Sequence, residues 1–324
     1  MSFFSGFKRR VQNLLSNANL PLRNLAERQL VLQALSHART NRGMGHIEAL
    51  SVVEFCAFSQ WGEDGIIDWL VERLPGIPPT FVEFGVENYF ESNTRLLLQL
   101  RNWRGLVMDG SISHIDDIRR QNVSWRHELS AKCAFIDRDN VDSLLTEAGF
   151  GGEIGLLSVD IDGNDYWVWE AIKATSPVIV VCEYNAVFGD LLSLTVPYKA
   201  DFQRTRVHHS NLYFGASLRA MISLAKKKGY TFFGTASTGC NAFFVRNDHA
   251  PVISSAIENI WAYPSNVREA RGADGSLLFT SGVARGDIIA SLPLVNLETN
   301  DVTTLAECRD IYSVEWRRSK KVGF

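Results

Sequence analysis

Five short apolar runs, separated in part by segments of helical pattern, constrain this chain more than any other feature of its sequence. Continuous apolar runs of this length are typical of strands buried on both faces of a parallel sheet. Helical patterns at 92–102, 140–148 and 164–173 lie between runs. The runs are TFVEFG (80–85), GLVMDG (105–110), AKCAFID (131–137), IGLLSVDIDG (154–163) and SPVIVVCEYN (176–185). The sequence therefore predicts a doubly wound α/β sheet.

The chain beyond this pattern predicts a closing hairpin and two extensions. A helix over 214–229 should end on Gly229 after three lysines. YTFFGTAS and NAFFVRND follow it with only TGC between them, which predicts an antiparallel hairpin. We expect an N-terminal helical extension at 1–54, the main domain at 55–250, and a C-terminal extension at 251–324.

The N-terminal extension contains an amphipathic pattern at 22–37, with six apolar residues near helical spacing. Packing against a domain edge is the first interpretation of such a helix. Formation of a homodimer, or contact with a membrane surface through Phe3, Phe4, Phe7 and Lys8-Arg9-Arg10, stays open. The six apolar residues are Leu22, Leu25, Ala26, Leu30, Leu32 and Leu35.

Composition excludes several classes of protein. With 46% hydrophobic residues the chain should fold, and with 33 basic against 36 acidic residues it lacks the basic footprint of a nucleic-acid binder. We expect no transmembrane segment and no signal peptide, because apolar stretches are too short and no cleavage site follows the first residues. Five scattered cysteines without a CxxC pair suit reduced thiols, so we expect a cytoplasmic protein.

Every apolar run ends in at least one carboxylate. Ligands of open α/β sheets bind beyond the carboxyl ends of the strands, so these residues are the candidates for a site. Clustered negative charges repel one another unless a cation or hydrogen-bond donors face them. The run ends are Glu83 to Glu87, Asp109 to Ser111, Asp137, Asp160 to Asp165, and Glu183 to Asn185.

The first two run ends suit a nucleoside ligand without a pyrophosphate. Gly85 permits close approach of the backbone to a ligand. GVENYF has one glycine where the dinucleotide fingerprint GxGxxG needs three, which counts against NAD and FAD. Asp109 follows Gly85 by 24 residues (109 − 85), the position of an acidic residue that binds ribose hydroxyls.

Six motifs together resemble the FkbM-type S-adenosylmethionine-dependent methyltransferases over about 55–250. The resemblance implies a class I methyltransferase fold, with seven strands and a closing hairpin, and S-adenosylmethionine as cofactor. It implies that Gln60 holds the methionyl end, that Glu83 and Gly85 form the first cofactor loop, and that Asp109 binds the ribose diol. Ser111 and Asp137 complete the predicted cofactor set. Asn88-Tyr89 stands where such loops often keep a further glycine. The motifs are SQWGED (59–64), FVEFG (81–85), SNTRLL (92–97), NWRGL (102–106), LLSVDIDGND (156–165) and NAFFVR (241–246).

The acidic turn DIDGND (160–165) is open to three interpretations. An EF-hand loop is excluded, because glycine stands at its fourth position and a strand precedes it. A glycosyltransferase-type DxD, with Asp160 and Asp162 holding a metal against a diphosphate, remains an alternative. In a methyltransferase, Asp160 with Glu183 and Asn185 would converge on Mg²⁺ or another divalent cation. Catechol O-methyltransferase resembles this plan, although its second strand carries an adjacent pair. Capping of the next helix by Asp162 and Asn164 accounts for part of the motif.

These residues predict an O-methyltransferase that acts on a hydroxyl of a sugar or glycoconjugate. The base would be Asp160 or the His208-His209 pair in the polar segment after the fifth run. The saccharide acceptor follows from the resemblance and from aromatic residues that could stack on sugars. The second function is a metal-dependent glycosyltransferase, and the third is a scaffold without activity. The aromatic residues are Tyr166, Trp167, Trp169, Tyr184, Tyr198 and Tyr213.

Overall fold

The computed structural model describes residue 22 and residues 24–324. The predicted membrane-surface motif at residues 3–10 lies outside this part of the chain. Within it, every helix is too short or too polar to span a bilayer.

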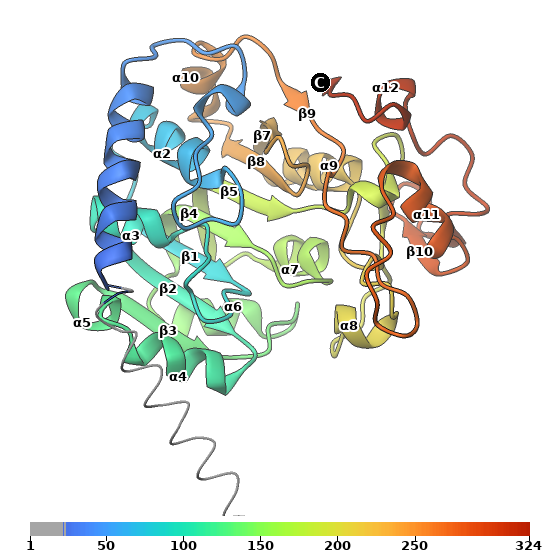
Figure 1. Cartoon of the computed structure of the whole chain (residues 1–324), viewed down its shortest axis with the longest axis horizontal. Coiled ribbons are helices and arrows are strands. Elements are labelled where there is room, and N and C mark those ends of the chain that lie inside the picture. Colours follow the sequence, from blue (N-terminus) through green and yellow to red (C-terminus); the bar gives the residue numbers. More distant parts are fainter. Residues whose placement is uncertain (1–21, 23) are drawn as a thin grey trace, which may run out of the picture.

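A seven-stranded sheet in the order β3-β2-β1-β4-β5-β8-β7 forms the centre of the molecule (Figure 1). Strands β1 to β5 are parallel, and β8 runs antiparallel to both β5 and β7. This topology confirms the predicted doubly wound sheet with its closing hairpin. The seven strands are β1 (Thr80–Phe84), β2 (Arg104–Asp109), β3 (Leu129–Cys133), β4 (Gly152–Val159), β5 (Thr175–Glu183), β7 (Tyr230–Thr235) and β8 (Asn241–Arg246).

Helices cover both faces of the sheet, and each face has its own apolar core. Side chains of α2, α3, α4 and α10 belong to one core, and those of α6, α7 and α9 to the other. The helices are α2 (Glu63–Arg73), α3 (Arg95–Arg101), α4 (Ile112–Arg120), α5 (Val123–Arg126), α6 (Val141–Glu147), α7 (Asp165–Ala171), α8 (Arg204–Val207), α9 (Leu218–Lys228), α10 (Ala250–Ser254), α11 (Arg285–Ile288) and α12 (Val314–Arg317), with short 3₁₀ turns η1 (Leu50–Val53), η2 (Ala186–Phe188) and η3 (Gly282–Ala284).

The alternation of side chains along β1 explains why apolar residues occupy both of its faces. Phe81 packs into the core of one face, and Val82 and Phe84 pack into the core of the other. A strand with helices on both sides needs apolar residues over most of its length, and the one carboxylate of β1, Glu83, stands next to its last residue. The chain therefore carries its polar chemistry where the strands stop.

The predicted N-terminal helix is present over residues 24–42, but a different face of it is buried. Ala34 and Ala38 are buried and Val31 packs beside Ala34, whereas Leu25 and Leu32 are 55% and 66% exposed. The helix lies against the α3 side of the molecule (Figure 1). Small residues at spacings of three and four let the backbone approach closely, so the predicted leucine stripe is not its packing face.

The C-terminal extension is part of the main core. Ala262, Leu294 and Trp316 belong to the same apolar cluster as the α7 and α9 side chains. A segment at 263–271, here called the strap, is held by the buried Arg285, which donates to the carbonyls of Ser265 and Val267 at 2.9 Å each. The remaining strands pair as β6-β10-β11 and β9-β12, with bounds β6 (Leu194–Thr195), β9 (Trp261–Ala262), β10 (Pro293–Asn296), β11 (Asp301–Thr304) and β12 (Val322–Gly323).

Candidate functional site

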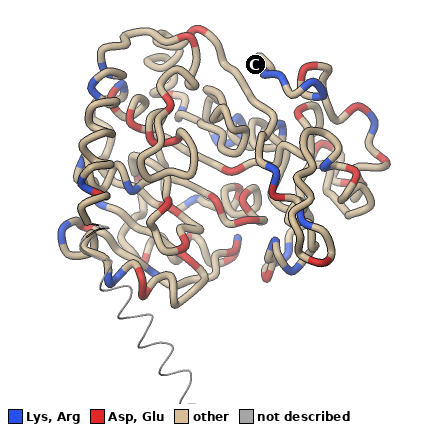
Figure 2. The backbone as a smooth tube through the Cα atoms, in the orientation of Figure 1, with Lys and Arg blue, Asp and Glu red and all other residues tan. Residues whose placement is uncertain are grey.

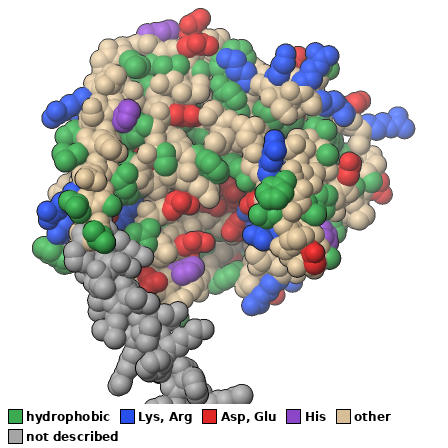
Figure 3. Space-filling view, in the orientation of Figure 1, with side chains coloured by type: hydrophobic (Ala, Val, Ile, Leu, Met, Phe, Trp, Pro, Cys, Tyr) green, Lys and Arg blue, Asp and Glu red, His purple; other side chains and the backbone are tan. Residues whose placement is uncertain are grey.

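Two adjoining cavities lie where β1, β2, β4 and β5 end. The Asp109 cavity, of about 250 Å³, is lined among others by Asp109, Phe135, Ile136, Asn164 and Phe202. The Glu183 cavity, also about 250 Å³, is lined among others by Asp162, Glu183, Arg204, Asn241 and Glu269. Both are lined by Gly85, Glu87, Asp160 and Asp162, so they form one cleft. Acidic residues gather in the middle of the fold and in the hollow of the surface (Figures 2 and 3).

Gly85 fixes the distance between the ends of β1 and β4. Its φ is +74°, and a Cβ atom on it would stand 1.6 Å from the carbonyl oxygen of Asp160. No larger residue fits without separating the two strands. The loop then continues through Glu87 and Tyr89, which both have positive φ without being glycine. Burial of Tyr89 and a hydrogen bond between its hydroxyl and that of Thr94 at 3.1 Å hold this conformation. The loop thus does without the second glycine of the resembling family.

Asp109 ends β2 and organises the turn around it. Its Oδ2 accepts the Glu87 N–H at 2.9 Å, and its Oδ1 accepts the Ser111 N–H at 2.7 Å. His114 Nδ1 lies 3.0 Å from the same Oδ1. Each oxygen has two or more lone-pair directions, so Oδ2 can accept a further hydrogen bond from the cavity.

Glu83 also lines the Glu183 cavity, but its carboxylate is occupied by its own loop. It accepts hydrogen bonds from the Ser92 and Thr94 hydroxyls at 2.5 Å each and from the Asn93 N–H at 2.8 Å. Burial raises the pKa of Glu83, and these hydrogen bonds work against that rise. Glu83 therefore positions the loop that precedes α3.

Two predicted cofactor residues lie outside the cavities, and Asn164, which we expected to cap a helix, lines one of them. Ser111 is the N-cap residue of α4 and bonds the Ser113 hydroxyl, while Asp137 accepts the N–H groups of Asp139 and Asn140. Asn164 lines the Asp109 cavity, and its Nδ2 donates to the Lys199 carbonyl at 2.9 Å. Its buried Oδ1 has no hydrogen-bond partner among the described residues.

Three carboxylates converge at the junction of β4, α7 and β5. Asp160, Asp165 and Glu183 each place one oxygen within 4.8 Å of the others. Burial, with the charges of Asp162 and Asp165, raises the pKa of Asp160 well above its usual range. Burial and the charge of Asp160 do the same to the pKa of Glu183. Asp165 differs, because its two oxygens accept the Ile161 and Gly163 N–H groups at 2.8 and 3.0 Å; burial still raises its pKa to about 6.

Arg204, from the segment after β5, is the cation that faces this cluster. It donates to Asp162 Oδ1 at 2.7 Å, pairs with Glu269 of the strap, and lies over the Phe214 ring at 3.8 Å. Burial acts to lower its pKa, but the nearby carboxylates, Glu183 first, outweigh burial and raise it. We expected a divalent cation or hydrogen-bond donors at this place and did not expect Arg204. The RTR run at 204–206 was the only signal for it.

Asn185 and the histidine pair do not join the cluster. Strand β5 ends at Glu183 and Asn185 caps η2: its Oδ1 accepts the Val187 N–H at 3.0 Å, and its Nδ2 donates to the carbonyls of Leu212 and Phe214. Asp165 occupies the position in the carboxylate cluster that we predicted for Asn185. His208 bonds Ser210 at 2.8 Å and packs on His209, and neither lines the described cavities. Burial, and next His209, lower the pKa of His208.

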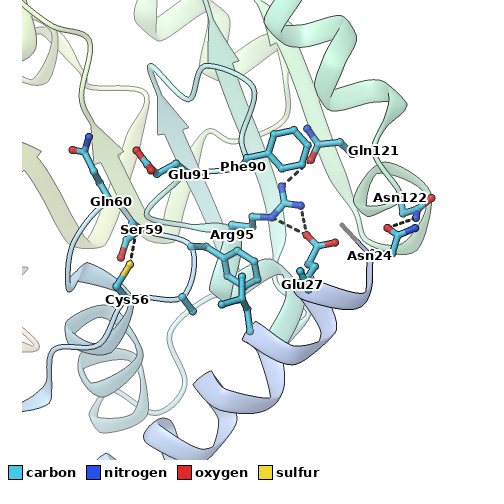
Figure 4. Close-up of a pocket in the computed structure, with 14 residues that line it drawn as sticks. Asn24, Glu27, Cys56, Ser59, Gln60, Phe90, Glu91, Arg95, Gln121 and Asn122 are labelled. Atoms are coloured by element: carbon cyan, nitrogen blue, oxygen red, sulfur yellow. Dashed lines mark hydrogen bonds and ion pairs between the residues drawn. The ribbon is translucent and has the colours of Figure 1, made fainter. Parts of the chain in front are cut away.

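Gln60 lies at the border of a third and larger cavity on the flank of the molecule. This flank cavity, of about 560 Å³, lies between the helix over 24–42 and the loops at 56–60 and 90–91 (Figure 4). Arg95 crosses it, bonded to Glu27 and to Gln121 Oε1 at 2.9 Å. Gln60 and Glu91 line this cavity and the Glu183 cavity alike, so the two adjoin.

Comparison with known proteins gives a likeness of fold. No protein-family profile matches the chain, and no curated protein sequence matches it. The N-terminal domain of EvdMO1 with S-adenosylhomocysteine bound is similar at 11% identity over 58% of this chain and 82% of that chain, with a TM-score of 0.40. An S-adenosylmethionine-dependent methyltransferase from Clostridium acetobutylicum matches at 10% identity over 57% and 90%, with a TM-score of 0.37. An O-methyltransferase from Bacillus cereus, in complex with S-adenosylhomocysteine, matches at 12% identity over 67% and 89%, with a TM-score of 0.36. These values concern the arrangement of helices and strands alone.

Proposed function

We propose that this protein is an S-adenosylmethionine-dependent O-methyltransferase that acts on a hydroxyl, as the resemblance to the FkbM-type family implies. The observation that carries the proposal is the single cleft at the strand ends, with Asp109 at one end, Gly85 and Asp160 in the middle, and Glu183 at the other. A nucleoside ligand with a short amino-acid arm suits such a cleft. The absence of a glycine-rich phosphate loop suits a cofactor without phosphate.

The Asp109 cavity supplies contacts for each part of the nucleoside. Asp109 Oδ2 accepts from the ribose hydroxyls, and Phe135, Ile136 and Phe202 give an apolar slot for adenine. The unpartnered Oδ1 of Asn164 accepts an N–H of the adenine amino group. The methionyl arm passes Gly85 toward Gln60.

When bound, S-adenosylmethionine supplies an electrophilic methyl group on a sulfonium. Asp160 is the base in our proposal: its raised pKa suits a carboxylate that takes the proton of an acceptor hydroxyl as the oxygen attacks. Arg204 and the strap hold the far wall, so that the hydroxyl lies between the base and the methyl group. His208 and His209 take no part.

The residues present do not fit the divalent cation that the sequence led us to expect. The side-chain oxygen of Asn185 already accepts a hydrogen bond in its own turn, and both oxygens of Asp165 already accept backbone hydrogen bonds. The guanidinium of Arg204 faces the same carboxylates and repels a doubly charged metal ion twice as strongly as a singly charged group at the same distance. We therefore derive no step through a metal, and we expect turnover to persist in excess EDTA.

A saccharide acceptor remains part of the proposal, with a different aromatic residue in contact with it. Tyr166, Trp169, Tyr184 and Tyr213 are buried in the core. Neither Trp167 nor Tyr198 lines the described cavities. Trp61 does line the Glu183 cavity and is 37% exposed, so a sugar face can stack on it at the entrance.

Thermal-shift titration of the full chain separates this function from the glycosyltransferase alternative. A ligand that binds only the folded state raises the melting temperature. We expect S-adenosylhomocysteine to stabilise the protein and UDP-glucose to leave it unchanged. Stabilisation by UDP-glucose alone would overturn the proposal.

A further inference from the structure

The inner wall of the Glu183 cavity has hydrogen-bond acceptors without donors. Glu183 on β5 and Asn241 on β8 are register partners, so their side chains lie on the same face of neighbouring strands. Asn241 is 6% exposed, and its Nδ2 donates to Glu63 Oε1 at 3.0 Å. Its Oδ1 and Glu183 Oε2 are both buried without a partner in the described part of the chain. Unpaired buried acceptors are costly, so a ligand with several donors would be favoured here.

The charge of the same cavity points to a cation. Seven acidic side chains and one basic side chain, Arg204, line it among the described residues. Asp162 and Glu269 are paired with Arg204, and Glu83 is held by its loop. The other four make no salt bridge in the described part of the chain, and the mutual repulsion of Asp160 and Glu183 is relieved only when a proton or a further cation joins them. The four are Glu87, Glu91, Asp160 and Glu183.

We propose that the methyl acceptor carries a protonated amino group, which donates to Asn241 Oδ1 and Glu183 Oε2 while a neighbouring hydroxyl is methylated. An ammonium group has three N–H donors and a positive charge, so it satisfies both acceptors and balances the carboxylates. A hydroxyl has a single donor and no charge. The acceptor class is therefore amino alcohols, amino sugars included. The inference rests on the proposed function for the ligand's role as methyl acceptor.

Three small probes isolate the two properties that the site should recognise. Ethanolamine has an ammonium and a hydroxyl, choline keeps the charge and the hydroxyl without an N–H, and ethylene glycol has hydroxyls without a charge. Each is titrated as a thermal shift into the full chain saturated with S-adenosylhomocysteine, at constant chloride. We expect ethanolamine to bind at least about tenfold more tightly than choline, because each charge-assisted hydrogen bond contributes about that factor. Ethylene glycol should give no shift.

Two variants test the residues. Asn241→Leu and Glu183→Gln should each remove about tenfold of the ethanolamine affinity and leave S-adenosylhomocysteine affinity within about twofold. If Asn241→Leu fails to fold, Glu183→Gln decides. Equal binding of ethanolamine and choline, no ethanolamine shift, or a shift by MgCl₂ alone would each overturn the inference. Failure of S-adenosylhomocysteine to bind the wild-type chain would contradict the proposed function and not this inference. In that case ethanolamine, choline and ethylene glycol are titrated without S-adenosylhomocysteine, and their order of affinity still tests the ammonium site.

Discussion

The two halves of the cleft satisfy their carboxylates in opposite ways. In the Asp109 half, Asp109 accepts two backbone N–H groups, from Glu87 and Ser111 in the loops beside it. In the Glu183 half, the partners are distant in sequence: Arg204 comes from the segment after β5, Asn241 from the hairpin and Glu269 from the strap. Each half keeps buried acceptors without a partner among the described residues, Asn164 Oδ1 in the first and Glu183 Oε2 and Asn241 Oδ1 in the second, but only the second depends on an arginine from a distant segment to face its carboxylates.

The largest effect should come from the residue that joins the halves. Gly85→Ala places a Cβ against the Asp160 carbonyl, at positive φ, and should lower the free energy of unfolding by about 3 kcal/mol or more. Gly76 has a similar φ of +83° but nothing within 4 Å of its Cβ position. Gly76→Ala should therefore cost about 1 kcal/mol. Urea denaturation measures both, and equal losses would show that the close approach to Asp160 contributes nothing.

Asp160→Asn separates chemistry from cofactor binding. Turnover should fall at least about 100-fold when the base is lost, with S-adenosylhomocysteine affinity unchanged.

The pKa of Asp160 is raised, so the folded chain keeps a proton that the unfolded chain loses above its ordinary pKa of 3.8. Between pH 3.8 and the raised pKa of Asp160, the free energy of unfolding therefore falls as the pH rises. The asparagine side chain of the variant has no carboxyl proton to lose, so the variant should be more stable than wild type at pH 7 but not below about pH 3.8. Retained turnover would remove Asp160 from the mechanism.

Arg204→Leu tests whether the arginine replaces a metal. Its partners Asp162 and Glu269 are 60% and 41% exposed, so water screens them and the loss of stability should be about 1 kcal/mol. Arg206→Leu, on the same short helix at an exposed position, should change stability by less than about 0.5 kcal/mol. The freed carboxylates should also make MgCl₂ stabilise the Arg204 variant more than wild type. A larger MgCl₂ shift in wild type would favour the metal after all.

The smallest effect concerns Asn164 in the Asp109 half. Asn164→Leu should lower S-adenosylhomocysteine affinity about three- to tenfold through one lost hydrogen bond. S-inosylhomocysteine, with a carbonyl in place of the adenine amino group, is the matched ligand. Calorimetry should find that wild type prefers the adenine compound and that the variant does not. An unchanged preference would place the adenine amino group elsewhere.

The contrast between contacts made within a loop and contacts made by distant segments also explains which features the sequence could predict. Strands, hairpin, Gly85 and Asp109 follow from local patterns, because burial on both faces and turn conformations depend on neighbouring residues. Asn185 was placed in the cluster because the fifth apolar run was extended to residue 185, two residues beyond the end of β5. Asp137 and Ser111 lie outside the described cavities, because a polar turn residue whose hydrogen bonds stay within its own turn has the same sequence pattern as one that binds a ligand. Arg204, Asn241 and Glu269 were missed because only the fold brings them to the strand ends.

Calorimetry with S-adenosylhomocysteine on three proteins tests the central claim most directly. Wild type should bind, and Asp109→Ala should lose about 2–4 kcal/mol of affinity with the ribose hydrogen bonds. Asp137→Ala is the matched control, because Asp137 ends the third apolar run and, among the described residues, its carboxylate accepts hydrogen bonds only within its own turn. The affinity of this variant for S-adenosylhomocysteine should stay within about twofold of wild type. Equal affinity of the Asp109 variant and wild type, or no binding by wild type, would contradict the account.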